Sequence, residues 1–234
     1  MTETKTLDIV WQSQERVPRL ISGNDALMIY NSLPEQARVG LRYDNATKTM
    51  VGSTPIAVAN LDSVAQRYGA RTPNLRDLSR PEIMRIARGK HYIDARNLVA
   101  RSRQDSDWSK NNPFLKTIYE LAEEKLGRIK EPFMIEGFSF VPNLGDKKSY
   151  RLTFVAEPDF NVVQDERLDG EHNGKMFSEV DELGIPKFYS KGNRTWFARK
   201  TGLSGLCLGG DMGIGSGGDD LVGSDGNGRV VFLK

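Results

Sequence analysis

The chain has 234 residues, with 33 Lys and Arg against 31 Asp and Glu, so a formal net charge of +2 favours neither nucleic acid nor an acidic partner. One cysteine excludes an internal disulfide framework and a zinc knuckle. No apolar run approaches the roughly 20 residues of a membrane span, and the first residues lack the apolar core of a secretory signal. We therefore expect a protein of the cytosol, of a viral particle, or of an unusual export route.

Short strands come first in the chain. Residues 7–11 and 39–43 have strand composition, and residues 50–58 form a second extended run after a polar turn. Apolar spacing then predicts helices. Ser79 and Glu82 have capping-box spacing around a proline, which predicts a helix start there.

Two further helices follow. Residues 94–103 are expected to be helical, with Ala95, Leu98 and Val99 on one side. Asn112 and a proline begin the longest helix, which Gly127 ends.

The second half of the chain changes to strand patterns. We expect strands over 133–141, 150–156, 195–199 and 229–233, the last one central in a sheet, and irregular loops over 157–183. Because no linker separates the halves, the prediction is one α+β domain over residues 1–234, with helices in the N-terminal half and a β-rich C-terminal half.

The segment 202–228 has an unusual composition. It holds 11 glycines in 27 residues, against 12 in the other 207, and it contains no Lys, Arg, Glu or Gln. A solvated loop drawn from the rest of the chain would contain some of those four residue types.

Apolar residues recur along this segment at alternate positions, which predicts one buried and one displayed face. The expected buried anchors are Leu206, Leu208, Met212, Ile214 and Leu221. The expected displayed, ligand-binding residues are Cys207, Gly209, Gly210, Asp211, Gly213, Gly215, Ser216, Gly217, Gly218, Asp219, Asp220, Gly223, Ser224, Asp225 and Asn227.

The displayed set contains only Gly, Asp, Ser, Cys and Asn. Replacing either adenine of the asparagine codon AAC with any base yields all five, and it never yields Lys, Glu, Gln, Met, Trp or a stop codon. Met212, which such replacement cannot produce, falls on the anchor face. This pattern indicates adenine-directed mutagenesis by a diversity-generating retroelement.

Three runs carry a family resemblance: Trp196-Phe197-Ala198-Arg199, Gly202-Leu203-Ser204-Gly205-Leu206 and Gly228-Arg229-Val230-Val231. At these runs the chain resembles the variable proteins of diversity-generating retroelements, in particular the nanoarchaeal group. Residues 94–99 and 177–182 extend the resemblance over most of the chain. It implies a C-type lectin fold that presents residues 203–228 as a hypervariable ligand-binding segment. The chain departs from bacterial and phage members, which carry Gly-Gly-Ser-Trp and end in Gly-Phe-Arg.

Other readings of the segment remain open. It could be a flexible glycine-rich tail of a structural viral protein. An adventitious calcium site could use Asp219, Asp220 and Asp225, although neither a calcium-roll nor an EF-hand spacing is present. The glycines at 213, 215 and 218 match a dinucleotide fingerprint by letter, but the chain nearly ends there.

An enzyme could pair Cys207 with His172 as nucleophile and base, against a displayed cysteine and a solvated histidine. We expect instead a non-enzymatic binding protein without cofactor or metal, a monomer whose ligand is a protein or glycan. By resemblance, that ligand lies on a partner cell, and the protein lies on a cell surface or virion. We expect no nucleic-acid partner and no membrane insertion.

Overall fold

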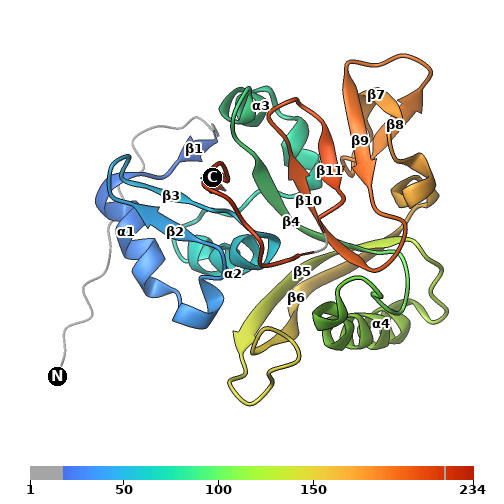
Figure 1. Cartoon of the computed structure of the whole chain (residues 1–234), viewed down its shortest axis with the longest axis horizontal. Coiled ribbons are helices and arrows are strands. Elements are labelled where there is room, and N and C mark those ends of the chain that lie inside the picture. The colour runs from blue at the N-terminus through green and yellow to red at the C-terminus, as the bar shows by residue number, and fades with distance from the viewer. Residues whose placement is uncertain (1–17, 219) are drawn as a thin grey trace.

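An eight-stranded sheet runs through the centre of the protein, in the strand order β6-β5-β4-β10-β11-β9-β7-β8 (Figure 1). The computed structural model describes residues 18–218 and 220–234, so the strand expected over 7–11 and the expected site residue Asp219 lie outside the described residues. Neighbouring strands are antiparallel except for the parallel pair β11 and β9. The strands are β4 (Ile93–Ala100), β5 (Phe133–Pro142), β6 (Leu152–Gln164), β7 (Met176–Val180), β8 (Pro186–Tyr189), β9 (Arg194–Ala198), β10 (Leu203–Leu208) and β11 (Ile214–Ser216).

Helices and two short sheets cover this central sheet. The helices are α1 (Gly23–Ser32), α2 (Pro55–Gln66), α3 (Pro81–Ala87) and α4 (Asn112–Leu126). The two-stranded sheets pair β1 (Arg19–Leu20) with β12 (Val231–Phe232), and β2 (Arg42–Asp44) with β3 (Thr49–Val51). Among the described residues the α-helices all end by residue 126, so the α+β class and the β-rich C-terminal half are confirmed.

Helix α4 forms where its end signals place it. Pro113 occupies the first turn, where its missing N–H leaves no hydrogen bond unmade, and Gly127 ends the helix at a φ of 75°. Phe114, Leu115 and Ile118 form the buried face. The N-terminal capping box expected at Ser79 is wrong, because α3 begins with Pro81 and no side chain caps it.

Helix α2 replaces most of the extended run expected over 50–58. Only β3 is extended there; the Thr54 hydroxyl then accepts the Ala57 backbone N–H at 3.1 Å, and Pro55 opens the helix. All but two residues of α2 are buried. A helix enclosed on every side shows no amphipathic period, and its β-branched residues imitate a strand.

Residues 94–103 were expected to be helical, and this is wrong because they lie mostly in β4. Two consecutive β10 residues pair with β4 residues three apart, so Arg96 and Asn97 form a bulge. The bulge restarts the alternation and places Ala95 and Val99 in the same hydrophobic core. Their spacing of four residues therefore has the period of a helix although the chain is a strand.

Two further expectations change in the C-terminal half. Residues 157–183 are not mostly loops, since β6 continues to residue 164 and β7 follows. Residues 229–233 form no central strand, because β12 pairs only with β1. Residues 230–233 are nonetheless at most 2% exposed: Val231 and Leu233 enter one core, and Val230 and Phe232 enter another.

The central sheet is buried on both faces. On one face, α2 and α4 cover a core that includes Leu98, Phe133 and Leu203. On the other face, α3 and the chain before it cover a core that includes Ile93 and Trp196. On the first face, the helices stop at the start of α2. Beyond that point lies the end of the sheet at which β4 begins and the β10–β11 turn is found. Of the glycine-rich segment, the β10–β11 turn lies at this end, whereas Gly202 and Ser216 lie toward the other (Figure 1).

Candidate ligand-binding face

The β10–β11 hairpin carries the first half of the glycine-rich segment. Leu206, Leu208 and Ile214 are fully buried, and Leu221 is 1% exposed, so these four expected anchors are confirmed. Met212 lies in the connecting turn with a φ of 69° and is only half-buried. The alternation holds where the chain is strand and ends where the turn begins.

A row of four side-chain positions crosses the opposite face of this hairpin. Cys207 pairs with Asp94 of β4 on one side and with Gly215 of β11 on the other, and Gly215 pairs with Phe197 of β9. We call these four residues the cross-strand row. Its outer ends differ, since Asp94 is 6% exposed and Phe197 is 42% exposed.

Phe197 belongs to the candidate site, although the sequence did not predict it as a site residue. It was assigned only to a strand, although it stands between Trp196 and Ala198, which are both buried. Period two therefore places it on the face that displays Gly215. An exposed aromatic ring next to small, changeable positions can supply apolar contact area that those positions lack.

Most of the glycines expected to be displayed have space for side chains. None of the seven has a φ in the left-handed region. A Cβ at Gly217 or Gly218 would meet nothing within 4 Å, one at Gly215 would lie 3.0 Å from Cys207 Sγ, and those at Gly209 and Gly223 would chiefly meet aspartate side chains. Position 210 is tighter, because a backbone nitrogen lies 3.1 Å from the added carbon. Gly213 was expected to be displayed, and this is wrong, because it is buried and an added Cβ would lie 2.7 Å from Phe197 Cε2 and 3.0 Å from the Thr195 carbonyl oxygen.

Three of the four glycines in residues 202–228 that the sequence pattern left out of the displayed set differ from these; the fourth, Gly226, is open. Gly202 has a φ of 78°, and a Cβ there would lie 2.5 Å from the Asp105 carboxyl. At Gly205 it would lie 2.1 Å from the ring of Pro55, and at Gly228 it would lie 2.5 Å from the Ser53 nitrogen. Close packing requires glycine at these three positions, as it does not at 215, 217 or 218.

Ser216 was expected to be displayed, and this is wrong. Its side chain is fully buried on the same side as Ile214, and its hydroxyl accepts a hydrogen bond from Arg101 Nη2 at 2.8 Å. The same guanidinium donates to Ser204 Oγ and to the Leu168 carbonyl oxygen. Burial lowers the pKa of Arg101 to about 10. Ser216 is thus part of the scaffold, as its two-residue spacing from Ile214 requires.

The loop after β11 is fastened at one point by Tyr92. The tyrosine hydroxyl donates to the Ser53 carbonyl oxygen at 3.0 Å, lies 2.8 Å from Ser224 Oγ, and accepts the Asp225 backbone N–H at 3.3 Å. Ser224 is consequently half-buried, whereas Asp225 and Asn227 are exposed. Burial raises the pKa of Tyr92 to about 12, so the hydroxyl remains protonated.

The described aspartates of the segment each stabilise their own turn. Each carboxylate accepts a hydrogen bond from the backbone N–H two residues further along, at 2.7–3.1 Å. The pairs are Asp211 with Gly213, Asp220 with residue 222, and Asp225 with Asn227. Residues 18–218 and 220–234 contain no group of three or more His, Cys, Asp or Glu that could hold a metal ion. The carboxylates are therefore arranged for local turns.

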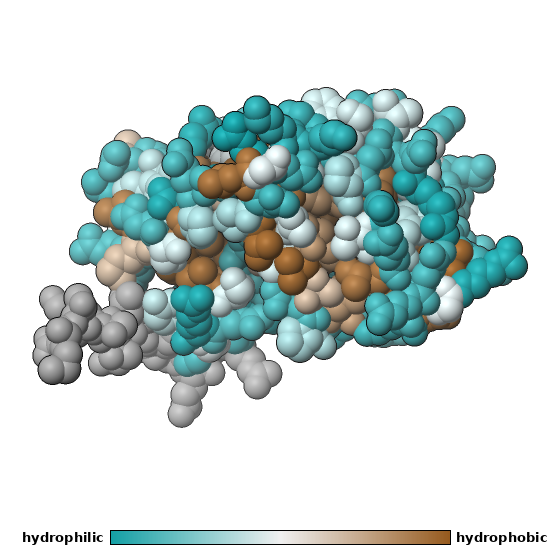
Figure 2. Space-filling model, turned by 90° about the horizontal axis from the view of Figure 1, so that it is seen from below, coloured by the Kyte–Doolittle hydropathy of each residue, from teal (hydrophilic) through white to brown (hydrophobic). Residues whose placement is uncertain are grey.

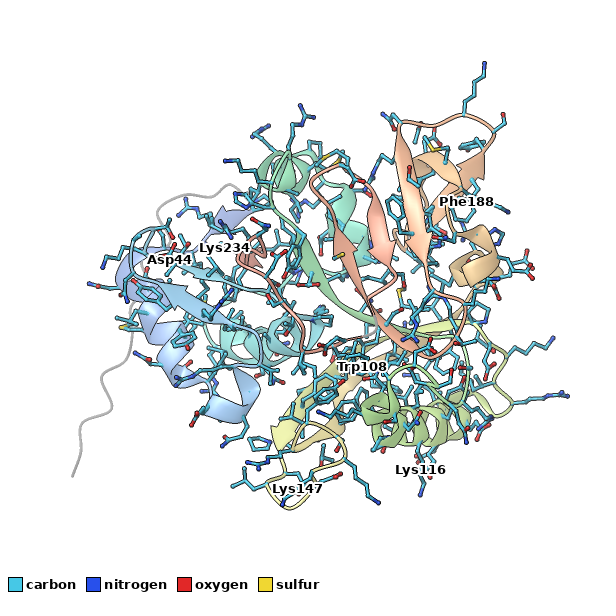
Figure 3. All side chains as sticks on the ribbon, viewed as in Figure 1. Asp44, Trp108, Lys116, Lys147, Phe188 and Lys234 are labelled. Carbon is cyan, nitrogen blue, oxygen red and sulfur yellow. The ribbon has the colours of Figure 1, made fainter. Side chains whose placement is uncertain are left out.

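Cys207 and His172 are not brought together. The His172 ring stacks on Phe188 at 4.9 Å, and Phe188 contacts Trp196 in the core of the opposite face (Figure 3). Burial, together with Asp94, raises the pKa of the Cys207 thiol to about 12. A thiol held protonated, with no histidine beside it, is a poor nucleophile.

Asp94 is the buried carboxyl at one end of the cross-strand row. Burial raises its pKa to about 7, and the Ser53 hydroxyl opposes this in part. Its Oδ2 atom has no hydrogen-bond partner among the described residues. A donor introduced at the neighbouring position 207 could pair with this oxygen, which is itself buried.

No helix in the described part of the chain has both the length and the apolar character needed to cross a bilayer. Comparison with known protein families, curated proteins and solved structures finds no match to the chain.

Proposed function

We propose that the chain is a variable, ligand-binding protein of a diversity-generating retroelement, with the C-type lectin-like scaffold of the nanoarchaeal group. It is not an enzyme in this proposal. The buried anchors hold the β10–β11 hairpin rigid, and the positions between them present side chains that the element rewrites. Substitutions at such positions change stability by less than about 0.5 kcal/mol, so one scaffold accepts many versions.

One observation carries the proposal, namely the steric difference between the two sets of glycines. The apolar alternation selected seven glycines as displayed, and none of them has a left-handed φ. Of the four glycines in residues 202–228 that it left out, Gly202, Gly205 and Gly228 are closed to a side chain by φ or by contacts of 2.1–2.5 Å, whereas Gly226 is open. A merely flexible glycine tail gives no reason for this agreement between the apolar alternation and packing.

The binding surface proposed for this copy is small and weakly functionalised. It combines the exposed ring of Phe197 with Cys207, several glycines and the exposed Asp211 and Asp225. Arginine, tyrosine and tryptophan, which most often dominate binding energy, are missing from the changeable positions. We infer a weak or highly selective binder of a protein or glycan, with Phe197 as its fixed aromatic contact.

Two matched libraries test the proposal. The first randomises positions 209, 215, 217, 218 and 223 with codons that vary the first two bases and end in C; the second does the same at 202, 205 and 228. Protease resistance of the displayed protein should survive in most members of the first library and be lost in most of the second. Equal loss in both libraries would refute the scaffold proposal.

The gene provides an independent test of the diversification step. Codons at the displayed positions should end in C or T, because AAC and AAT templates preserve the third base. Several glycine codons ending in A or G at these positions would contradict adenine-directed mutagenesis. The test extends to the neighbourhood of the gene, where a reverse transcriptase and an asparagine-rich copy of the 3′ end are expected.

A further inference from the structure

The loop between β5 and β6 carries the most exposed large apolar side chain of the described residues. Leu144 is 61% exposed, and Val141, at the end of β5, is 42% exposed. The Asp146 backbone N–H donates to the Asn143 carbonyl oxygen at 3.0 Å, which places Leu144 at the tip of a closed turn. The turn is an ordered element that holds an apolar side chain in solvent.

Four lysines surround the base of this loop. Lys110, Lys116, Lys147 and Lys148 line a hollow of about 550 Å³ at the start of α4, and no acidic residue lines it. All four are exposed, and they form no ion pair with a carboxylate of the described residues. The first turn of α4 also lacks an acidic residue.

The carboxylate of the same loop does not cancel this charge. Asp146 accepts hydrogen bonds from the Lys148 backbone N–H at 2.8 Å and from the Ser149 hydroxyl at 2.7 Å, so it is directed into the loop. Glu120 and Glu123 lie further along α4, beside a neighbouring hollow that shares Lys116. The surface around Leu144 thus has a net positive charge, with four lysines against the one carboxylate of Asp146.

We propose that this surface docks on an anionic phospholipid bilayer. Lysine ammonium groups beside a bilayer are attracted by the negative potential of anionic headgroups, and an apolar side chain at a loop tip gains by entering the acyl boundary. Charge alone would suit any polyanion. Leu144 and Val141 favour the bilayer, because a nucleic acid or a sulfated chain offers no apolar layer to receive them.

The orientation that follows suits a displayed binding face. Lys116 and Lys147 lie at the lower edge of the molecule (Figure 3). Figure 2 views the molecule from below and shows apolar residues among polar ones on this side. The β10–β11 turn lies at the upper edge, where the Gly89 backbone N–H donates to the Gly210 carbonyl oxygen at 2.9 Å. A molecule docked through the β5–β6 loop would present that turn away from the bilayer. The docking itself does not depend on the proposed function.

Vesicle co-sedimentation tests the docking. The probes are vesicles of phosphatidylcholine alone and vesicles with roughly 30% phosphatidylglycerol, at about 0.05 M and about 0.5 M NaCl. The full chain should sediment with the anionic vesicles at low salt only. Replacing Lys147 and Lys148 together with Gln should lower the partition coefficient about 25-fold, from about fivefold per lysine. The matched variant at Lys187 and Lys191, two exposed lysines of the β8 region, should behave as the unchanged protein.

The Leu144→Ser variant tests whether the lysine surface binds a bilayer or any polyanion. It should lower vesicle binding about fivefold, since the apolar insertion is lost, while circular dichroism stays unchanged. No binding to anionic vesicles, or equal binding to neutral ones, would overturn the proposal. The proposal would also be overturned by two results together: the Leu144→Ser variant binds vesicles as well as the unchanged protein, and duplex DNA binding depends on Lys147 and Lys148 as vesicle binding does. The site would then be a general polyanion surface.

Discussion

Asp94→Asn tests whether a buried carboxyl lies at one end of the cross-strand row. The pKa of Asp94 rises from 3.8 to about 7 on burial. At about 1.4 kcal/mol per pKa unit, ionising this group in the folded protein costs about 4 kcal/mol. Asparagine has nearly the same shape and carries no charge, so it removes this cost.

The direction of the pH dependence follows from the raised pKa of Asp94. Below about pH 4 the carboxyl is neutral in both states, and it has no effect on the free energy of unfolding. Between about pH 4 and pH 7 the unfolded chain releases the proton while the folded protein keeps it, so stability falls as the pH rises. Above about pH 7 both states are ionised and the full cost remains.

Urea unfolding of both proteins at about pH 5 and about pH 8 measures the effect. We expect the stability gained on Asp94→Asn to be about 2 kcal/mol at the lower pH and about 4 kcal/mol at the higher one. The exposed Asp159, changed to Asn, serves as the control and should show no such growth. A stability difference that is constant with pH would refute the argument, because the carboxyl would then titrate alike in both states.

Three further predictions concern the β10–β11 hairpin, the loop after it and the neighbouring strand β9. Ser216→Val should lower the free energy of unfolding by about 2 kcal/mol, because it removes a hydrogen bond to the buried Arg101 guanidinium. Chemical denaturation measures this change, and an unchanged unfolding midpoint would contradict the scaffold role of Ser216. Tyr92→Phe should speed hydrogen exchange of the Asp225 backbone N–H about tenfold, corresponding to about 1–2 kcal/mol, and exchange at the unchanged rate would show that the hydroxyl does not fasten the loop. Phe197→Ala should weaken the binding of ligands selected against the protein at least about tenfold with little change in thermal stability, and calorimetry that finds equal affinity would remove Phe197 from the site.

The sequence predicted best where local chemistry decides the structure. Pro113 and Gly127 delimit α4 correctly because both residues act through their own backbone. The anchors Leu206, Leu208 and Ile214 are correct because a hairpin strand keeps its alternation.

The failures have long-range causes. The bulge in β4 depends on its pairing with β10, which no local pattern in residues 94–103 records. The enclosure of α2 depends on the sheet that covers it. Phe197 and Ser216 follow from strand alternation and could have been placed, but Ser216 was assigned from its residue type and not from its distance to Ile214.

The buried tail after the loop has a consequence for any gene that rewrites the loop. Residues 230–233 fill two cores with four apolar side chains, and each is worth about 2 kcal/mol of burial. Their combined loss, about 8 kcal/mol, is comparable to the whole stability of a typical domain. A copying error that shifts the reading frame within the loop would scramble these side chains and leave a chain that cannot fold. In-frame changes escape this penalty, so folding itself screens the copies and passes only those whose reading frame is intact through residues 230–233.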